Sequence, residues 1–212
     1  MKPDIYAVRY HRHFASLRSE ATAVLELGIA EGDSLEMWRD FFARATIVGL
    51  DLKPCPLPEP GGQVRIYQGS QDDLTLLDRI ARECAPDGFD LIVDDCAHVG
   101  ELAKKSFWHL FDHYLKPTGV YVLEDWGTGY WPQWFDGQKF EQRPDRRRRR
   151  ATEFPSHSAG MPGLLKQLMD ECAATDIRTG GSSYRSPHKL IGRLDIYMGQ
   201  AFVFPYLNPE YP

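Results

Sequence analysis

Acidic side chains follow two short apolar segments near the middle of the chain. Asp95 comes just after the segment 89–93, and Glu124 and Asp125 come directly after the segment 120–123. If these segments are neighbouring parallel strands, their ends lie about 5 Å apart, so the three carboxylates could converge on one ion. Clustered carboxylates repel one another unless a cation or protons compensate them, and an all-oxygen set favours a hard cation. We therefore predict that Asp95, Glu124 and Asp125 bind Mg²⁺.

A histidine lies close to this acidic group in the sequence. His98 is three residues beyond Asp95, in the turn that would follow the strand. A bound metal ion can hold a substrate diol and lower the pKa of its hydroxyl group, and His98 would then be placed to remove the proton as the catalytic base. The alternative is structural: the Asp94-Asp95 pair caps the next helix, His98 is a solvated turn residue, and the second acidic pair simply ends its strand.

A segment with two glycines follows the first predicted strand. It reads ELGIAEGDS over residues 26–34, and in an open parallel sheet such loops lie at the strand ends where ligands bind. Gly28 and Gly32 would let the backbone approach a ligand, and the next helix offers N–H groups to a carboxylate. The spacing is G-x-x-x-G rather than G-x-G-x-x-G, and Glu31 would repel a pyrophosphate, so we expect a nucleoside that lacks one. Alternatively, the glycines only shape a tight turn.

Other acidic strand ends complete the predicted cofactor site. Asp51 ends the second strand and is placed to accept hydrogen bonds from ribose hydroxyls. We also assign Glu26, within the first predicted strand, and Asp94, directly after the fourth, to the cofactor-binding set.

The hydrophobic pattern supplies the elements that would position these residues. Short apolar runs alternate with amphipathic ones, which predicts βαβ units and a parallel sheet. Strands are predicted at 23–27, 46–50, 64–68, 89–93 and 120–123, followed by a β-hairpin of 191–198 and 201–204. Helical periodicity marks the segments from about 33 to 42, 74–84, 102–114 and about 164–169. The order predicts an α/β fold with a Rossmann-like seven-stranded sheet, mostly parallel with a C-terminal antiparallel hairpin, and helices on both faces.

Turn and cap residues mark the helix ends. Asp33 or Ser34 would cap the helix after the glycine segment, and Asp72 or Asp73 would cap the helix 74–84. The segment 116–119, Lys-Pro-Thr-Gly, is predicted to stop the helix before the fifth strand.

Length and composition fit one globular domain. The 212 residues, of which 42% are hydrophobic and 26% charged, suffice for one α/β core. We divide the chain into a lead-in or cap helix at 1–20 and a single domain at 21–212, with a lid-like insertion at about 126–160 where periodicity is lost. Aromatic residues of this insertion could stack on sugars or flat rings, whereas the arginine run 146–150 is either a solvated loop or an anion site.

Charge and targeting signals argue against several classes of protein. A formal net charge of -5 argues against a nucleic-acid-binding surface. No segment approaches membrane-spanning length, and the four cysteines form no CxxC pair. We expect a cytoplasmic protein with a small-molecule partner and with no nucleic-acid or membrane partner. The sequence leaves open whether the chain forms a homo-oligomer.

Five motifs give the chain a family resemblance. They are ELGIAEGDS, VGLDL at 48–52, QGSQDD at 68–73, VDDCAH at 93–98 and LEDWGTGYW at 123–131. Through them, about residues 20–200 resemble class I S-adenosylmethionine-dependent methyltransferases. The resemblance is to a family that joins metal-dependent sugar O-methyltransferases of macrolide biosynthesis with proteins called cephalosporin hydroxylases. It implies a seven-stranded methyltransferase sheet and an S-adenosylmethionine-dependent, Mg²⁺-assisted O-methyltransferase acting on a hydroxyl of a small molecule such as a sugar or natural-product moiety.

The resemblance also implies roles for single residues. The three carboxylates and the histidine singled out above match the Mg²⁺ ligands and the base of the family. Gln71 and Asp72 match the region that meets adenine, and Ser34 matches the region near the methionine carboxylate. Two departures are Cys96-Ala97 in place of the more usual Gly-Ser, and Ser70 in place of a common Asp.

Two other functions stay open. The hydroxylase name motivates a non-haem iron enzyme, which would need a second histidine near Asp95 and His98. The other histidines considered are His109, His113, His157 and His188. None of these four stands at a comparable strand end. A non-catalytic nucleoside-binding domain would keep the fold without the chemistry.

Overall fold

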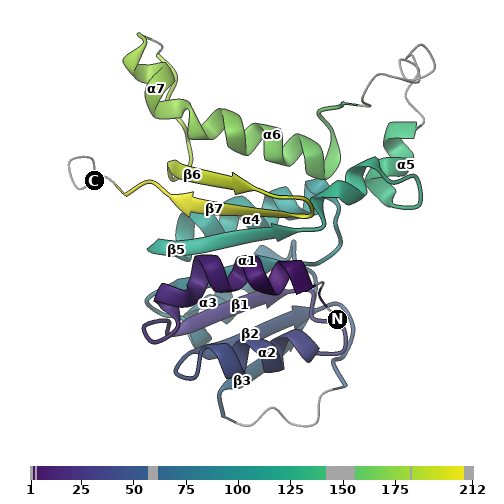
Figure 1. The fold of residues 1–212 in the computed structure, drawn as a ribbon, viewed down its shortest axis with the longest axis vertical. Helices are drawn as coiled ribbons and strands as arrows, with labels where there is room; N and C mark the ends of the chain where they lie inside the picture. The colour runs from purple at the N-terminus through teal and green to yellow at the C-terminus, as the bar shows by residue number, and fades with distance from the viewer. Residues whose placement is uncertain (1, 3, 57–61, 142–155, 182, 208–212) are drawn as a thin grey trace.

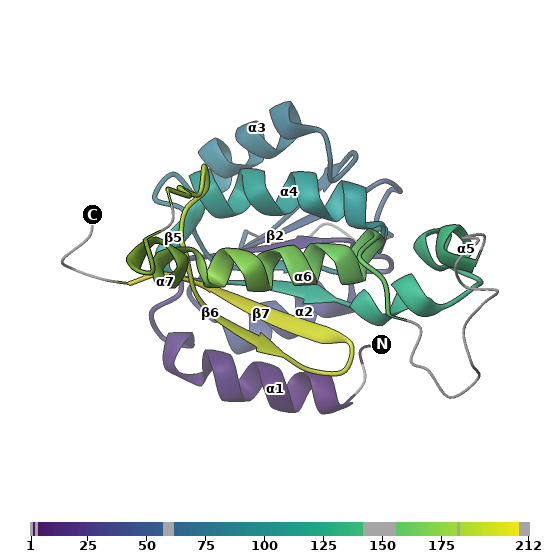
Figure 2. The ribbon, with the colours of Figure 1, turned by 90° about the horizontal axis from the view of Figure 1, so that it is seen from above.

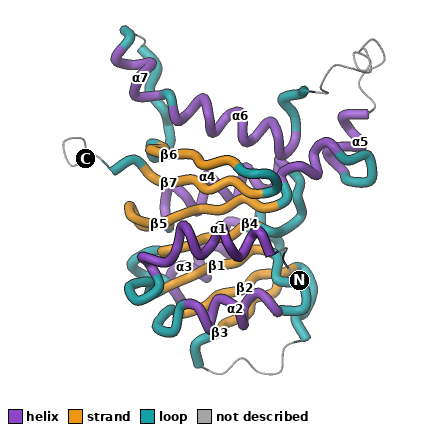
Figure 3. The backbone as a smooth tube through the Cα atoms, viewed as in Figure 1, coloured by secondary structure: helices purple, strands orange, loops and turns teal. Residues whose placement is uncertain are grey.

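One β-sheet organises the molecule. The computed structural model describes residues 2, 4–56, 62–141, 156–181 and 183–207. Seven strands form the sheet in the order β3-β2-β1-β4-β5-β7-β6 (Figures 1 and 3). They are β1 (Ala23–Leu27), β2 (Thr46–Asp51), β3 (Val64–Gln68), β4 (Phe89–Asp94), β5 (Leu115–Glu124), β6 (Ile191–Ile196) and β7 (Gln200–Pro205). The first five run parallel and β7 is antiparallel to both β5 and β6, which confirms the predicted mixed sheet and hairpin.

Helices cover both faces of the sheet. Seen from above, α3, α4 and α6 lie on one side and α1 and α2 on the other (Figure 2). The α-helices are α1 (Asp4–Phe14), α2 (Asp33–Phe41), α3 (Leu74–Cys84), α4 (Gly100–His113), α5 (Phe135–Glu141), α6 (Gly160–Cys172) and α7 (Ala174–Thr179). Two 3₁₀ helices, η1 (Ala15–Leu17) and η2 (Trp126–Tyr130), complete the elements. Among the described helices, none is long and apolar enough to cross a bilayer.

The central strands are buried on both faces because the helices form two cores. In β1, Leu25 and Leu27 belong to the core under α3, α4 and α6, whereas Val24 belongs to the core under α1 and α2. Successive side chains of a strand point to opposite faces, so a strand between two helical layers is apolar throughout. This explains why the strands of the parallel sheet appear in the sequence as continuous apolar runs.

Two local predictions about element ends are wrong. The segment 116–119 does not lie between a helix and a strand, because β5 already begins at Leu115, which pairs with Phe89 of β4. The pairing of β5 with β4, which includes a register irregularity, outweighs the turn signal of the Pro-Thr-Gly sequence. The N-cap of α2 is Gly32 in the left-handed conformation, with no side-chain cap from either predicted residue.

The predicted cap of α3 is present. Asp73 precedes this helix and accepts a hydrogen bond from the backbone N–H of Leu76. A carboxylate in this position satisfies one of the free N–H groups of the first turn.

The predicted insertion contains ordered structure next to β5. The helices η2 and α5 follow β5, and α5 carries Asp136 and Phe140, which are buried, and Phe135, which is exposed. The segment 142–155, with the arginine run 146–150, lies outside the described residues. Whether the insertion acts as a lid stays a prediction.

Asp136 joins three helices through its side chain. Its Oδ2 accepts hydrogen bonds from the backbone N–H groups of Gly100, at 2.8 Å, and Met161, at 2.9 Å. These groups belong to the first turns of α4 and α6, whose N–H groups have no partner within their helix. One carboxylate thus caps two helices and holds α5 against both.

Replacing Asp136 by alanine should lower the free energy of unfolding by about 1–4 kcal/mol, because two helix caps worth about 0.5–2 kcal/mol each are lost. Urea unfolding followed by circular dichroism measures this. Asp136→Asn keeps a side-chain oxygen and should lose clearly less. Equal losses for the two variants would contradict a capping role.

Candidate active site

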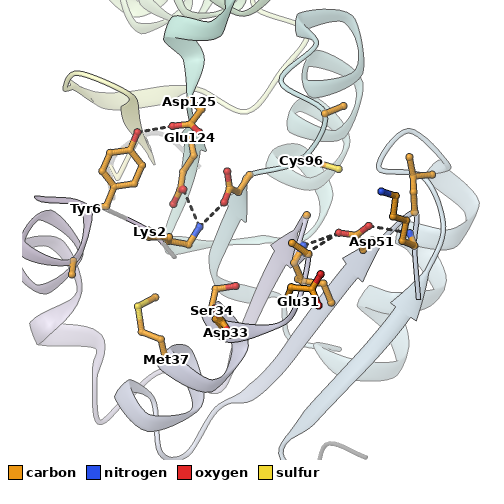
Figure 4. A pocket seen from close by; sticks show the side chains of 18 of the residues that line it. Lys2, Tyr6, Glu31, Asp33, Ser34, Met37, Asp51, Cys96, Glu124 and Asp125 are labelled. Atoms are coloured by element: carbon orange, nitrogen blue, oxygen red, sulfur yellow. Dashed lines mark hydrogen bonds and ion pairs between the residues drawn. The ribbon is translucent and has the colours of Figure 1, made fainter. Parts of the chain in front are cut away.

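A cavity of about 590 Å³ opens at the carboxyl edge of the sheet. The loops after β1, β2 and β4, the end of β5, the start of α2 and the N-terminal segment line it (Figure 4). Open α/β sheets bind ligands at this edge, and the volume suits a small-molecule cofactor. The predicted site residues that line the cavity are Gly28, Ser34, Asp51, Asp95, Glu124 and Asp125.

The glycine loop after β1 packs directly on the loop after β4. Gly28 has a φ of 84°, and a Cβ atom at this position would lie 2.3 Å from the carbonyl oxygen of Asp95. Gly32 has a φ of 90° where α2 begins. Glycine adopts such backbone angles at little cost and leaves room for the close approach. The turn therefore depends on these glycines, and it places two cavity-lining loops side by side.

Asp51 fixes the other side of the same loop. Its Oδ2 accepts hydrogen bonds from the backbone N–H groups of Ile29 and Ala30, both at 3.0 Å, and its Oδ1 accepts one from Lys53 N–H, also at 3.0 Å. Burial opposes ionisation, but these three hydrogen bonds outweigh it and lower the pKa of Asp51. A carboxylate has about four acceptor positions, so Asp51 both shapes the loop and keeps capacity for a ligand hydroxyl.

Lys2 lies among three carboxylates, and Figure 4 shows its side chain next to that of Glu124. Its Nζ is 2.7 Å from Asp95 Oδ2, 2.9 Å from Glu124 Oε2 and 3.1 Å from Glu26 Oε1. Burial opposes the charge of Lys2, but the three carboxylates outweigh it and raise the pKa of Lys2 above its ordinary value. Burial raises the pKa of Glu26 and Glu124 in turn, and Lys2 opposes that rise.

A second group combines two carboxylates with the predicted base. His98 Nε2 lies 3.8 Å from Asp95 Oδ1 and 3.9 Å from Asp125 Oδ2, and one ligand atom from each residue falls within 4.8 Å of the others. His98 and Asp125 both have a φ of 50°. Positive φ values are uncommon outside glycine and cluster at functional sites. The edge of Trp134 covers His98, with ring centroids 5.1 Å apart.

The donor chemistry of this group suits a hard divalent cation. Asp95 and Asp125 offer the oxygen ligands that Mg²⁺ prefers, which leaves the imidazole of His98 beside the ion. Glu124 lies next to this group, and its carboxylate contacts Lys2, as one oxygen of Asp95 also does. Its assignment as a Mg²⁺ ligand stays a prediction.

Comparison with known proteins identifies similar sequences and a similar fold. No protein-family model matches the chain. Mycinamicin VI 2''-O-methyltransferase of Micromonospora griseorubida is 35% identical over 97% of this chain and 49% of its own length. Demethylmacrocin O-methyltransferase of Streptomyces fradiae is 32% identical, again over 97% of this chain and 49% of its own. A solved structure of MycE methyltransferase in complex with Mg, SAH and mycinamycin VI superposes with a TM-score of 0.75, at 32% identity over 97% of this chain and 50% of that one. Over nearly its whole length, the chain is similar to these methyltransferases in sequence and fold. It spans about half the length of the relatives it matches.

In this methyltransferase sheet, the side chains of Gln71 and Asp94, both predicted cofactor residues, are buried against each other. Asp94 accepts hydrogen bonds from Gln71, Ser106 and Tyr121, and Gln71 Oε1 accepts one from the backbone N–H of Ala97. Burial raises the pKa of Asp94 to about 6 despite these donors. Neither Gln71 nor Asp94 lines the cavity, so in this structure both support the loop that carries Asp95 and His98 from behind.

Asp72 and Glu26, which were predicted to bind the cofactor, do not line the cavity either. Asp72 lies outside the cavity, where Ser70 and Lys105 donate hydrogen bonds to its carboxylate. Glu26 is fully buried and accepts a hydrogen bond from the indole N–H of Trp38. Their assignment to cofactor binding stays a prediction.

The described histidines do not assemble an iron triad in this methyltransferase fold. His109 contacts Asp78, and His188 contacts Asp112. His157 is buried against the carbonyl of Gly129. In the described part of the chain, His98 is the histidine of the metal-competent group, whereas a non-haem iron oxygenase of the considered type needs two.

Two residues of the site were missed by sequence reasoning. Lys2 and Tyr6 both reach the carboxyl edge, and the Tyr6 hydroxyl donates to Asp125 Oδ1 at 2.7 Å. Tyr6 belongs to α1, which was expected only to cover the sheet. Neither residue lies in a motif, so no sequence signal marked them.

Proposed function

We propose that the chain is an S-adenosylmethionine-dependent O-methyltransferase that uses Mg²⁺ and acts on a hydroxyl group of a small natural product, such as a sugar. The main support is the position of the Asp95–His98–Asp125 group, which adjoins a cavity built from the glycine loop. The names of the relatives add the class of acceptor, because both are O-methyltransferases of macrolide compounds.

The cavity offers different chemistry to each part of the cofactor. The loop 28–34 and the N-terminus of α2 present backbone N–H groups to the methionine carboxylate. Asp51, at the end of β2, accepts from the ribose hydroxyls. Glu124 lines the acidic end, with the buried Glu26 behind Lys2, and this end suits the cationic amino group of the methionine part.

His98 and its two carboxylate neighbours carry the reaction. When Mg²⁺ is bound by Asp95 and Asp125, it orients the acceptor and lowers the pKa of its hydroxyl group. His98 accepts the hydroxyl proton while the acceptor oxygen bonds to the methyl carbon. The bond from the methyl group to sulfur breaks, and its electron pair converts the sulfonium to a thioether. In-line alignment of oxygen, carbon and sulfur requires both partners to be held at this edge.

Aromatic side chains of the segment after β5 provide a surface for the acceptor. Trp134 lies against His98 and is partly exposed, and Trp131 is about half exposed. Flat aromatic rings bind the apolar faces of sugars and exclude water from the reacting groups. This surface supports a glycosidic acceptor over a highly charged one.

Calorimetry with S-adenosylmethionine and S-adenosylhomocysteine tests the proposal. One molecule of either nucleoside should bind per chain, and Asp51→Ala should weaken binding about 10- to 100-fold, because hydrogen bonds to a charged group worth about 1.5–3 kcal/mol are lost. Asp40→Ala, an equal change of charge on the exposed side of α2, should bind as the wild type does. A folded sample that binds neither nucleoside would exclude the proposed function.

A further inference from the structure

The ammonium group of Lys2 already occupies the acidic end of the cavity. Its three carboxylate contacts lie between 2.7 and 3.1 Å, which is the range of charge-assisted hydrogen bonds from nitrogen to oxygen. In this structure the carboxylates of Glu26, Asp95 and Glu124 surround a primary ammonium.

The methionine part of S-adenosylmethionine ends in a group of the same chemistry. It carries one primary ammonium next to its carboxylate, and the loop 28–34 that suits this carboxylate lines the same cavity as Lys2. Two ammonium groups repel each other and compete for the same oxygen atoms, so one position holds only one of them.

We propose, on the basis of the function proposed above, that Lys2 is an internal competitor that occupies the position of the cofactor's amino group. S-adenosylmethionine or its product binds fully only when the Lys2 side chain withdraws. The three carboxylates have a cation partner in both states, which limits the repulsion among them when no cofactor is present.

Withdrawal of the Lys2 side chain requires little change in the rest of the structure. Lys2 precedes α1, and that helix is anchored further along by Tyr10 and Phe14, which are buried against Trp38 and Phe202. Lys2 therefore lies just before a helix whose later turns are packed in the core. Its release leaves that packing in place.

Replacing Lys2 by methionine tests the competition, because methionine keeps the length and apolar character of the stem without the charge. Any purification tag is placed at the C-terminal end. The affinity of a ligand is reduced by the fraction of protein that is competent to bind, so a competitor in place nine-tenths of the time lowers it about tenfold. Lys2→Met should therefore tighten S-adenosylhomocysteine binding about tenfold. It should leave the affinity for 5′-methylthioadenosine unchanged, since this nucleoside lacks the amino group.

Lys104→Met is the matched control, because Lys104 is exposed on α4 and does not line the cavity. It should change neither affinity. Unchanged or weaker S-adenosylhomocysteine binding by Lys2→Met would overturn the inference. An equal gain for both nucleosides would also overturn it, because Lys2 would then act as a steric plug. If the wild type bound neither nucleoside, the proposed function itself would fail.

A measurement on the unaltered chain covers the case in which Lys2→Met does not fold. The experiment uses an amine-acetylating reagent in metal-free buffer. Lys2 Nζ should be acetylated slowly without ligand and several-fold faster with S-adenosylhomocysteine bound. Mass spectrometry of the N-terminal peptide gives both rates, and the exposed Lys104 provides the reference. Slower or equal labelling of Lys2 in the complex would contradict its release.

Discussion

Replacing Asp125 by asparagine should lower Mg²⁺-dependent methyl transfer at least about 100-fold and leave the affinity for S-adenosylhomocysteine nearly unchanged. Asp125 lies in the group with Asp95 and His98 but does not contact Lys2. Its replacement therefore tests metal binding separately from cofactor binding. A neutral amide oxygen is a poorer ligand for a hard cation, and a metal that polarises a hydroxyl contributes several kcal/mol to the transition state. Asparagine also tolerates the positive φ of this position.

The measurement combines turnover with direct metal binding. Mn²⁺ serves as a spectroscopic replacement for Mg²⁺, and its affinity by electron paramagnetic resonance should fall in Asp125→Asn. Turnover of the wild type, measured with mycinamicin VI as a trial acceptor, should stop with a chelator and return with added Mg²⁺. Asp87→Asn, an equal change of charge at an exposed position, should match the wild type. Full transfer rates in chelator would exclude a role for the metal.

Asp95→Ala gives an informative contrast because Asp95 contacts Lys2 and also lies in the group with His98 and Asp125. It should lose metal-dependent turnover as Asp125→Asn does. Its cofactor affinity should change little, since both Lys2 and the cofactor's amino group lose the same partner. A large loss of nucleoside affinity in this variant would show that Asp95 favours the cofactor over Lys2.

Replacing His98 by asparagine should slow methyl transfer by roughly 10²- to 10⁴-fold, the usual effect of losing a general base. His98 lies between Asp95 and Asp125, and its imidazole is held by Trp134. Asparagine accommodates the φ of 50° at this position without providing a base of suitable pKa. Affinities for Mn²⁺ and S-adenosylhomocysteine should remain those of the wild type.

Single-turnover kinetics at saturating cofactor isolates the transfer step in this variant. His11→Asn, on the exposed side of α1, is the matched control and should transfer at the wild-type rate. Wild-type rates without His98 would exclude it as the base. A parallel fall in Mn²⁺ affinity would identify His98 as a metal ligand rather than a base.

The sequence by itself determined the order of elements and the acidic edge of the sheet. The bounds predicted for the first and third strands, 23–27 and 64–68, are those observed. The first is buried along its whole length, as expected of a strand between two helical layers. The neighbouring positions of β4 and β5 bring Asp95 near Asp125, as the strand-end argument expected. These inferences worked because periodicity and strand ends are local properties of the chain.

The tertiary structure decided which side chains at that edge line the cavity and which form hydrogen bonds within the core. Gln71 and Asp94 belong to motifs but are used within the core, since Ser106 of α4 and Tyr121 of β5 complete their hydrogen bonds. Pairing with β4 drew the segment 116–119 into β5. Lys2 meets Asp95 and Glu124 across separations of 93 and 122 residues. Contacts over such separations arise only when strands and helices from distant parts of the chain pack together, so no local pattern encodes them.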